Sequence, residues 1–196
     1  MKLCLFGAAS NDIADVFYSD GLALGRRMAQ RGHSLIFGGG DSGMMGAVAR
    51  GMSEYGGHIT GIAPSFFNVD GVLYERCDDF IYTDTMRERK QRMEELSDGF
   101  IVSPGGIGTM EEFFEIFTLR QLGRHQKPIA ILNTDGYFDP MLRMLRHTAD
   151  CRFMSELNLQ LFYVSGDVDR LLDYLEQPDL SQPDPALLRR TKPKEA

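Results

Sequence analysis

The residues of this chain whose types and spacing could do chemistry lie in and beside two glycine-rich segments. One segment, residues 104–112, reads Pro-Gly-Gly-Ile-Gly-Thr-Met-Glu-Glu, and apolar residues at helical spacing follow it. A helix that begins near Thr109 would direct free backbone N–H groups and the positive end of its dipole toward a bound anion. The segment lacks the Gly-Lys-Ser/Thr ending of a nucleoside-triphosphate P-loop. We therefore expect a cradle of backbone amides that binds a phosphate group.

Glu112, at the end of this segment, has two interpretations. Thr109 and Glu112 have the spacing of a capping box, in which each side chain accepts a hydrogen bond from a backbone amide at the helix N-terminus. Glu112 would also border the apolar face of the helix, beside the expected anion cradle. There its carboxylate could pair with a water molecule or a ribose hydroxyl. This position beside the cradle favours the second, chemical interpretation.

The other glycine-rich segment, residues 38–46, follows a short apolar run and precedes a helical pattern. Its Gly-x-Gly-x-x-Gly spacing is formally the dinucleotide fingerprint, which also requires an acidic residue at the end of the next strand. That strand ends with residues 61–64, Gly-Ile-Ala-Pro, and this disfavours a nicotinamide or flavin enzyme. A glycine-lined crossover and a loop that approaches a ligand closely both remain open. In the second case the ligand-binding glycines are Gly39, Gly40 and Gly43.

An arginine in the basic stretch 84–97 is predicted to point inward. An arginine on a buried helix face needs an anion or a carboxylate partner. Arg89 therefore either binds a ligand or forms a structural ion pair with a glutamate inside the fold, whereas Arg92 falls on a face that we expect to be solvated. The apolar residues that share the helix face of Arg89 are Met86, Met93 and Leu96.

The apolar pattern predicts an α/β fold with a doubly wound sheet. Short, nearly continuous apolar runs alternate with longer amphipathic ones, as in a mostly parallel sheet with helices on both faces. In such sheets, ligands bind beyond the carboxyl ends of the strands. The expected strands are residues 2–6, 34–37, 58–63, 79–82, 99–103, 128–132 and 161–165. The expected helices are residues 20–31, 43–55, 86–97, 110–122, 138–149 and 167–176.

Length and composition indicate one globular domain. The chain has 196 residues, of which 43% are hydrophobic and 25% are charged, and these values are ordinary for a globular protein. Because no internal repeat or second core is evident, we expect a single domain over residues 1–177. Residues 178–196 contain four of the eight prolines and show no periodicity, which predicts a loosely ordered tail.

The charge and cysteine counts exclude several classes of protein. A net charge of −7, from 21 basic and 28 acidic residues, argues against a binder of nucleic acid or anionic membranes. Three scattered cysteines and four dispersed histidines form neither a disulfide framework nor a metal site. No apolar run approaches the roughly 18 residues of a membrane span, and no signal-peptide pattern occurs. We therefore expect a cytoplasmic protein that binds no metal.

Several motifs, in the expected order, resemble those of the LONELY GUY (LOG) family. The segment 104–112 looks like the family signature Pro-Gly-Gly-x-Gly-Thr-x-x-Glu. Residues 86–90, Met-Arg-Glu-Arg-Lys, are similar to the family motif Met-His-x-Arg-Lys. The glycine-rich segment 38–46 and the opening strand and loop at 6–10 also resemble the family, and the likeness extends over residues 2–176.

The resemblance implies a Rossmann-like fold and a phosphoribohydrolase that releases a purine, cytokinin-type base from a nucleoside 5′-monophosphate without a cofactor. Members of the family are often mislabelled as lysine decarboxylases. The resemblance also implies a homodimer, which the wide apolar stripe expected on helix 110–122 favours independently. By motif position the catalytic residues are Arg89 and Glu112, and Arg87 replaces the usual histidine as a surface variation. The residues implied in substrate binding are Gly39, Gly40, Gly43, Lys90, Gly105, Gly106, Ile107, Gly108, Thr109, Glu111 and Thr118.

Three other functions compete with this one. A non-catalytic carrier of a nucleotide or phosphorylated cofactor would use the same fold and bind its ligand without turnover. A pyridoxal-phosphate decarboxylase needs a lysine placed for a Schiff base, and no lysine follows a strand end in such a setting. An oxidoreductase lacks the acidic residue noted above. The identity of the base stays open, because the residues that could line an apolar base pocket could equally belong to the core or a dimer contact: Phe66, Phe67, Met44 and Met45.

Overall fold

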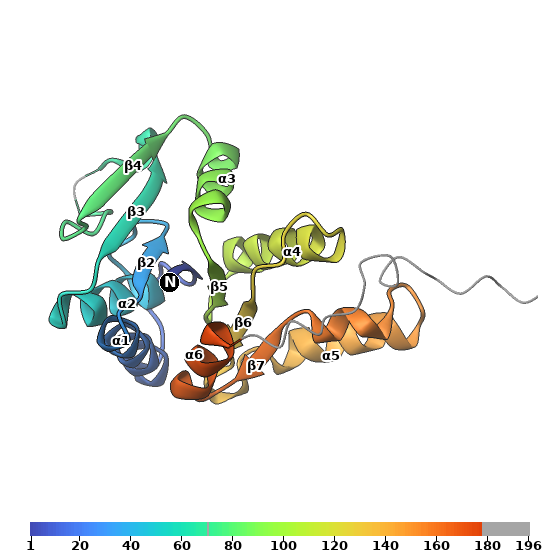
Figure 1. Ribbon diagram of the computed structural model, residues 1–196. Helices are drawn as coiled ribbons and strands as arrows, with labels where there is room; N and C mark the ends of the chain where they lie inside the picture. Colours follow the sequence, from blue (N-terminus) through green and yellow to red (C-terminus); the bar gives the residue numbers. More distant parts are fainter. Residues whose placement is uncertain (70, 178–196) are drawn as a thin grey trace, which may run out of the picture.

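One sheet of seven parallel strands forms the centre of the molecule (Figure 1). The computed structural model describes residues 1–69 and 71–177, so the tail predicted over 178–196 lies outside the described residues. The spatial order of the strands is β4-β3-β2-β1-β5-β6-β7. Their bounds are Lys2–Phe6 (β1), Ser34–Phe37 (β2), Ile59–Pro64 (β3), Asp79–Thr83 (β4), Gly99–Val102 (β5), Ile129–Leu132 (β6) and Tyr163–Ser165 (β7).

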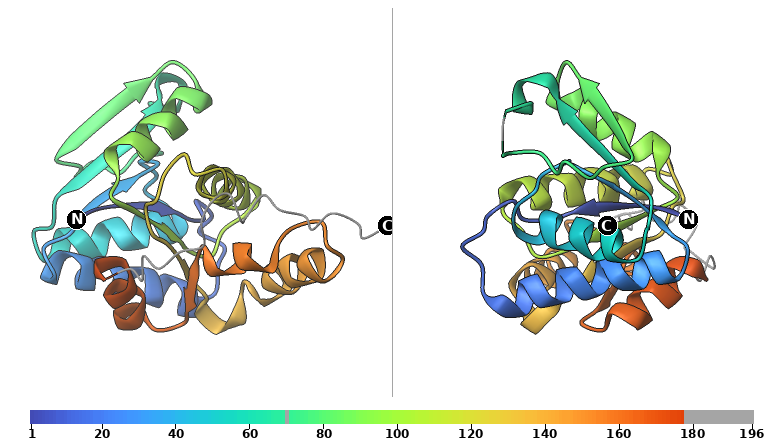
Figure 2. Two further views of the ribbon diagram at one scale, coloured as in Figure 1. Left: turned by 45° about the vertical axis from the view of Figure 1, so that its right-hand side comes forward. Right: turned by 90° about the vertical axis from the view of Figure 1, so that its left-hand side faces the viewer.

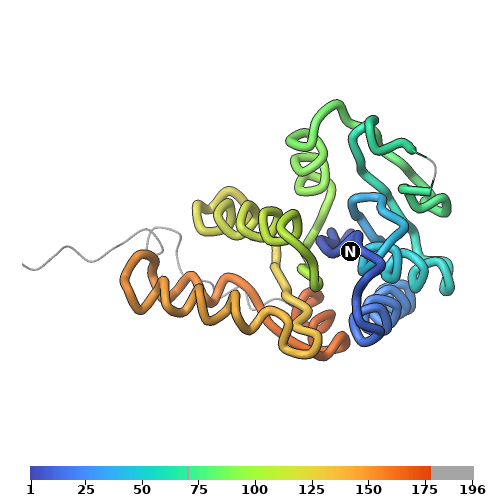
Figure 3. Tube along the Cα trace, turned by 180° about the vertical axis from the view of Figure 1, so that it is seen from behind, coloured from blue at the N-terminus to red at the C-terminus, as the bar shows by residue number. Residues whose placement is uncertain are grey.

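Helices cover the sheet on both sides (Figure 2). On one face α1, α2 and α6 pack against Leu3 and Leu5 of β1, and on the other α3, α4 and α5 pack against Cys4 and Phe6. Both sets of strand residues are apolar because successive side chains point to opposite, covered faces. Seen from behind, α4 and α5 lie side by side (Figure 3). The helix bounds are Asp15–Gln30 (α1), Gly43–Glu54 (α2), Met86–Leu96 (α3), Ile107–Gln121 (α4), Asp139–Asp150 (α5) and Val168–Glu176 (α6).

All the predicted strands and helices are present, and most of their boundaries agree closely with the prediction. The helix α1 begins at Asp15 instead of residue 20, because Phe17 packs against the core and this contact overrides its low helix propensity. The helix α4 begins at Ile107, inside the glycine-rich segment, instead of near residue 110. In the described part of the chain no helix combines the length and apolarity that a bilayer span requires. Three short 3₁₀ segments were not predicted: Ser65–Phe67 (η1), Thr134–Gly136 (η2) and Glu156–Gln160 (η3).

The chain reverses its direction across the sheet between β1 and β5. Strands β1 to β4 progress toward one edge, and β5 then pairs with the opposite side of β1, with Phe6 beside Val102. Ligands of doubly wound folds bind at such a switch point, beyond the carboxyl ends of the strands. Here the two following loops are joined, because the Ala8 N–H donates to the Pro104 carbonyl at 3.0 Å. The topology thus brings the segment 104–112 to the edge where ligands bind.

Candidate active site

A cavity of about 610 Å³ opens beyond the carboxyl ends of β1, β2 and β5. This volume is typical of small-molecule sites, which range over about 300–1,000 Å³. Residues from both glycine-rich segments line the cavity, together with residues of α3 and of the chain between β3 and β4. The predicted site residues that line it are Gly40, Arg89, Gly106, Gly108, Thr109, Glu111 and Glu112.

Arg89 from α3 and Glu112 from α4 form a buried ion pair at this cavity. The Arg89 Nη1 donates to Glu112 Oε1 at 2.9 Å, and each side chain is 10% exposed. The Arg89 Nε–H also donates to the carbonyl oxygen of Ile62 in β3, at 3.2 Å. These two bonds fix the plane of the guanidinium. The prediction that Arg89 points inward is confirmed, and its carboxylate partner is the glutamate that the signature marks as catalytic.

The environment of Glu112 favours proton binding more than bulk water does. Burial raises the pKa of its carboxyl, and the neighbouring Arg89 guanidinium opposes this shift. Groups with such opposed influences cluster at sites that exchange protons or stabilise charge during a reaction. Because both side chains line the cavity, a bound ligand can contact them where water is largely excluded.

The capping box, which was the less favoured of the two interpretations of Glu112, does not form. The helix follows the N-cap residue Gly106, so Thr109 lies inside the first turn and not at the cap. No side chain caps this helix, and the Glu112 carboxylate accepts from Arg89 instead. The first N–H groups of a helix have no partner within the helix. At α4 they are consequently available to a ligand.

The N-terminus of α4 has the open geometry that an anion cradle requires. A Cβ atom placed on Gly106 or Gly108 would meet no other atom within 4 Å, and both glycines line the cavity. Gly105 is confined instead, because a Cβ there would lie 2.1 Å from Thr109 Oγ1. The side chain of Ile107 is 84% exposed, so only its backbone can contribute to the cradle.

In the glycine-rich segment 38–46, most of the glycines are required for close packing, and only part of the segment lines the cavity. A Cβ on Gly38 would lie 2.1 Å from Arg89 Nη2, so this glycine makes room for the guanidinium. Gly39 and Gly43 have positive φ, and a Cβ on either would clash, with the Phe80 ring and with the Ser10 carbonyl oxygen respectively. Gly40 alone among the three predicted ligand-binding glycines lines the cavity.

Lys90 and Thr118, both predicted to bind substrate, do not line the cavity of the described chain. Lys90 forms an ion pair with Glu111 and a second with Glu115 at 2.7 Å, so it fastens α3 to α4. Thr118 is exposed and follows Glu112 by six residues, which places it about 9 Å farther along the helix.

Apolar side chains form another wall of the cavity. Phe67 lies in η1, Val72 follows it, and Met86 begins α3; they are 41%, 40% and 42% exposed. Exposed apolar groups on the wall of a cavity suit the flat face of a nucleobase. Of the four residues considered for a base pocket, Phe67 and Met45 line this wall. Met44 is fully buried in the core, and Phe66 is 61% exposed and does not line the cavity.

Two residues that shape the site are absent from the predicted set. Gly38 belongs to the fingerprint spacing, so the sequence carried a signal for it but none for its role beside Arg89. Tyr137, which directly follows η2 and precedes α5, donates its hydroxyl hydrogen to the Gly105 carbonyl oxygen at 2.7 Å. Nothing in the sequence marks Tyr137, because the contact spans 32 residues and depends on how the strands are ordered.

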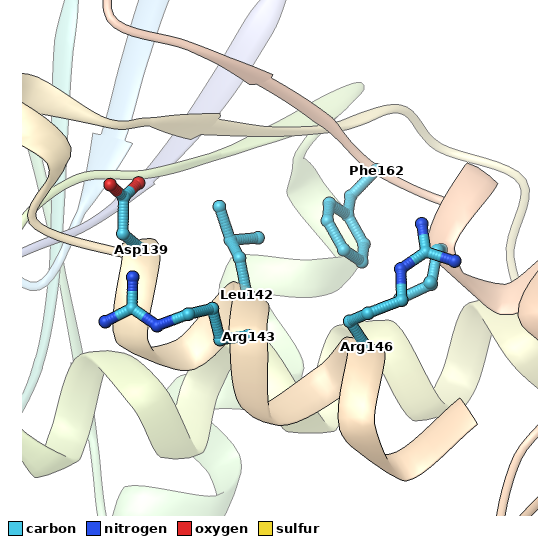
Figure 4. A pocket seen from close by; sticks show the side chains of 6 residues that line it. Asp139, Leu142, Arg143, Arg146 and Phe162 are labelled. Atoms are coloured by element: carbon cyan, nitrogen blue, oxygen red, sulfur yellow. The ribbon is translucent and has the colours of Figure 1, made fainter. Parts of the chain in front are cut away.

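A second hollow, of about 380 Å³, lies along α5 (Figure 4). Leu142 and Phe162 stand between Asp139 and Arg143 at one end and Arg146 at the other. A carboxylate already compensates Arg146, which pairs with a glutamate of η3 at 2.5 Å. None of the predicted site residues lines this hollow. The candidate site is therefore the cavity that contains Arg89 and Glu112.

The donors of this cavity suit a phosphorylated sugar better than a metal ion. Over residues 1–69 and 71–177, no three His, Cys, Asp or Glu side chains lie close enough together to hold a metal. The cavity offers the Arg89 guanidinium and the amides of the first turn of α4, which are donors for phosphate and hydroxyl oxygens.

Curated proteins similar to this chain are named for one activity. A cytokinin riboside 5′-monophosphate phosphoribohydrolase of Arabidopsis thaliana is 32% identical over 90% of this chain and 83% of its own length. A second from the same plant is 33% identical over 89% of this chain and 77% of its own length. A probable enzyme of the same name from Oryza sativa subsp. japonica is 34% identical over 90% of this chain and 79% of its own length.

Solved structures share the fold at lower identity. The molybdenum cofactor binding protein from Rippkaea orientalis superposes with a TM-score of 0.69 at 20% identity, over 89% of this chain and 94% of its own. The Moco carrier protein from Chlamydomonas reinhardtii superposes with a TM-score of 0.67 at 22% sequence identity, over 90% of this chain and 95% of its own. Residues 45–175 match the family described as "Possible lysine decarboxylase". With the curated relatives, this match shows that the chain belongs to that family, the LOG family that its motifs resemble.

Proposed function

We propose that this protein hydrolyses the N-glycosidic bond of a purine nucleoside 5′-monophosphate, such as AMP or a cytokinin-type nucleotide. The products are the free base and ribose 5-phosphate. The observation that carries the proposal is the buried pair of Arg89 and Glu112 in one cavity with the free amides of α4. The names of the curated relatives, which are phosphoribohydrolases of cytokinin riboside 5′-monophosphates, support it.

In this proposal the phosphate and the apolar wall position the sugar. The amides of residues 105–109 bind the 5′-phosphate at the positive end of the α4 dipole. The base packs against Phe67, Val72 and Met86. Binding energy from these two remote groups holds the bond to be cleaved beside Glu112.

The cleavage itself adds one water molecule across the bond between C1′ and the base nitrogen. Such bonds break through a sugar with oxocarbenium character, so positive charge develops on the ring. The Glu112 carboxylate stabilises that charge and orients the attacking water or a ribose hydroxyl. The water oxygen becomes the hydroxyl on C1′, and a proton from the water ends on the departing base. Arg89 holds Glu112 in place and adds a positive charge toward the substrate oxygens.

A non-catalytic carrier of a nucleotide or phosphorylated cofactor is the second candidate function. Solved structures with this fold are named as a molybdenum cofactor binding protein and a Moco carrier protein. Their identities to this chain, 20% and 22%, convey the fold alone. The two candidates differ in one measurable respect, which is turnover.

Incubation of the purified protein with AMP, followed by chromatography, tests the proposal. We expect adenine and ribose 5-phosphate in equal amounts, and far less cleavage of adenosine, which lacks the phosphate that the amide cradle binds. A parallel incubation with an N6-alkylated AMP shows which base is preferred. Tight binding of AMP with no adenine from either nucleotide would contradict the hydrolase and favour the carrier.

We also propose that the protein is a homodimer. Within one chain Phe113, Ile116 and Phe117 are already buried, so the stripe of α4 does not itself require a partner. The proposal rests on the family resemblance and on exposed apolar residues near α4 and α5, notably Met144 at 50% and Phe153 at 85% exposure. Light scattering at micromolar concentration should give about twice the 22.0 kDa of one chain, and a mass near 22.0 kDa would refute the dimer.

We propose the cytoplasm as the place of this activity. The cysteines Cys4, Cys77 and Cys151 are all free, as is usual in a reducing compartment. Fractionation of the source cells with an antibody against this chain checks the assignment.

A further inference from the structure

We infer that Tyr137 is a positioning residue that fixes the orientation of the peptide bond between Gly105 and Gly106, and thereby the phosphate-binding amide of Gly106. The inference rests on the proposed phosphate cradle and extends it to a residue outside every sequence motif. Tyr137 does not line the cavity, so any effect it has on the ligand must pass through the loop.

The hydroxyl of Tyr137 is the donor that holds this peptide. It donates to the Gly105 carbonyl oxygen at 2.7 Å. In a trans peptide the carbonyl oxygen and the following N–H point in opposite directions. With its carbonyl held by Tyr137, the peptide therefore directs the N–H of Gly106 away from Tyr137, and Gly106 lines the cavity. The preceding carbonyl, of Pro104, is held in the same manner by the Ala8 N–H at 3.0 Å.

The loop needs such a restraint because glycine occupies both sides of this peptide. A half-turn of the peptide plane would carry φ of Gly106 from −83° into the positive region, which glycine enters without a steric penalty. The flipped peptide would present the Gly105 carbonyl oxygen, instead of an N–H group, to the phosphate. A carbonyl dipole facing a phosphate is repulsive, so the flip would weaken the cradle without unfolding the helix behind it.

Ring contacts and hydrogen bonds hold Tyr137 in a fixed position. Its ring packs edge-on against the ring of Phe17 in α1, with 5.7 Å between the ring centres, and against the ring of Phe138, with 5.0 Å between the centres. Its N–H donates to the carbonyl of Thr134, whose hydroxyl donates to Asp20 of α1 at 2.7 Å. The loop after β5 is thus attached through Tyr137 to an element on the other face of the sheet.

The substitution Tyr137→Phe tests the inference, because it keeps the ring and removes only the hydroxyl. Calorimetry should show binding of AMP and of ribose 5-phosphate weakened about tenfold, which is the scale of one hydrogen bond. Adenosine, which lacks the phosphate, should bind as it does to the unchanged protein. In turnover assays KM for AMP should rise while kcat stays within about twofold, because the lost interaction is with the bound phosphate.

The matched control is Tyr163→Phe in β7, whose ring stacks on Tyr174 at 4.7 Å and lies outside the cavity. This control should leave the affinity for AMP unchanged. Unaltered AMP affinity in Tyr137→Phe would overturn the inference, and so would an equal loss for AMP and adenosine, since that marks a general structural effect. Binding of AMP by the unchanged protein without release of adenine would refute the proposed hydrolysis and leave this binding comparison readable.

Discussion

Replacement of Glu112 by glutamine is expected to lower kcat for AMP hydrolysis by about 100-fold or more, the scale of a positioned acid or base group. Glutamine keeps the size of the side chain and an oxygen that can accept from Arg89 Nη1. It loses the negative charge that the proposal uses to stabilise the cationic sugar and to orient the nucleophile. Steady-state kinetics below the unfolding temperature of the variant measure the effect.

Glu115→Gln provides the matched control on the same helix. Glu115 is an exposed carboxylate that pairs with Lys90 and lies outside the cavity, so its change should leave kcat near the original value. A Glu112→Gln protein that is folded and turns over AMP normally would show that the glutamate only supports the structure.

Glu112→Gln should also destabilise the protein, because it leaves the Arg89 guanidinium buried beside a neutral amide. Removal of one partner of a buried ion pair costs about 3–5 kcal/mol, whereas replacement of both by apolar groups is often neutral. The double variant Arg89→Met with Glu112→Leu should therefore regain much of the lost melting temperature and remain inactive. Recovery of activity together with stability would contradict a chemical role for the pair.

The pH dependence of kcat/KM provides a separate test of the state of Glu112. If the ionised carboxylate is the active form, activity falls as the pH drops through the pKa of Glu112. Burial raises that pKa, so the acidic limb should lie above the ordinary range for glutamate. The limb should be absent from the residual activity of Glu112→Gln. An acidic limb that persists unchanged in the variant would assign it to another group.

Arg89→Lys is expected to reduce kcat/KM by about tenfold to 100-fold although it preserves the positive charge. Arginine uses two edges of its planar fork here, one toward the Ile62 carbonyl and one toward Glu112. A lysine ammonium is a point donor on a flexible stem and cannot hold both positions at once. Kinetics together with a melting curve separate the loss of activity from any loss of fold.

The control for this prediction is Arg92→Lys on the same helix. Arg92 is 53% exposed and pairs with Glu95 at 3.2 Å, and such surface pairs contribute about 1 kcal/mol or less. Its change should leave both kinetics and stability nearly unaltered. Equal losses of activity from Arg89→Lys and Arg92→Lys would contradict the placement of Arg89 in the active site.

The position of the guanidinium can also be disturbed without changing Arg89 itself. A methyl group in Gly38→Ala would lie 2.1 Å from Arg89 Nη2, so the guanidinium must shift. This variant should reproduce part of the activity loss of Arg89→Lys. Gly166→Ala is its counterpart, because a Cβ there would make only an ordinary contact, 3.4 Å from the Asn133 carbonyl oxygen. Full activity in Gly38→Ala would show that the position of the guanidinium does not matter.

The order of strands and helices along the chain was predictable, because each element has a recognisable local pattern of apolar residues. The sheet is parallel and covered on both faces, so its strands are short apolar runs separated by amphipathic helices. The prediction failed at the starts of α1 and α4. Phe17 is a poor helix former that packing keeps in α1. At α4, the glycines before Thr109 disfavoured the prediction of a helix, although the first turn of α4 includes one of them.

The error at α4 changed the interpretation of Glu112. If the helix started near Thr109, Thr109 and Glu112 could form a capping box, and Glu112 could then have a purely structural role. In the structure the helix starts at Ile107 without a side-chain cap, and Glu112 is instead the partner of Arg89. The sequence left two alternatives for Arg89, a bound ligand or a structural ion pair with a glutamate. The structure shows the ion pair, and its glutamate is Glu112, the residue that we propose to act in catalysis.

The sequence by itself determined the elements, the inward face that carries Arg89 and the amide cradle that begins α4, because helical and strand periodicity and glycine spacing are local properties. Only the tertiary structure decided which of these meet. Arg89 contacts residues 27 positions before it and 23 after it, and Tyr137 reaches a carbonyl 32 positions away. These contacts exist because β5 pairs with β1 instead of β4, and no local pattern encodes that choice of neighbour.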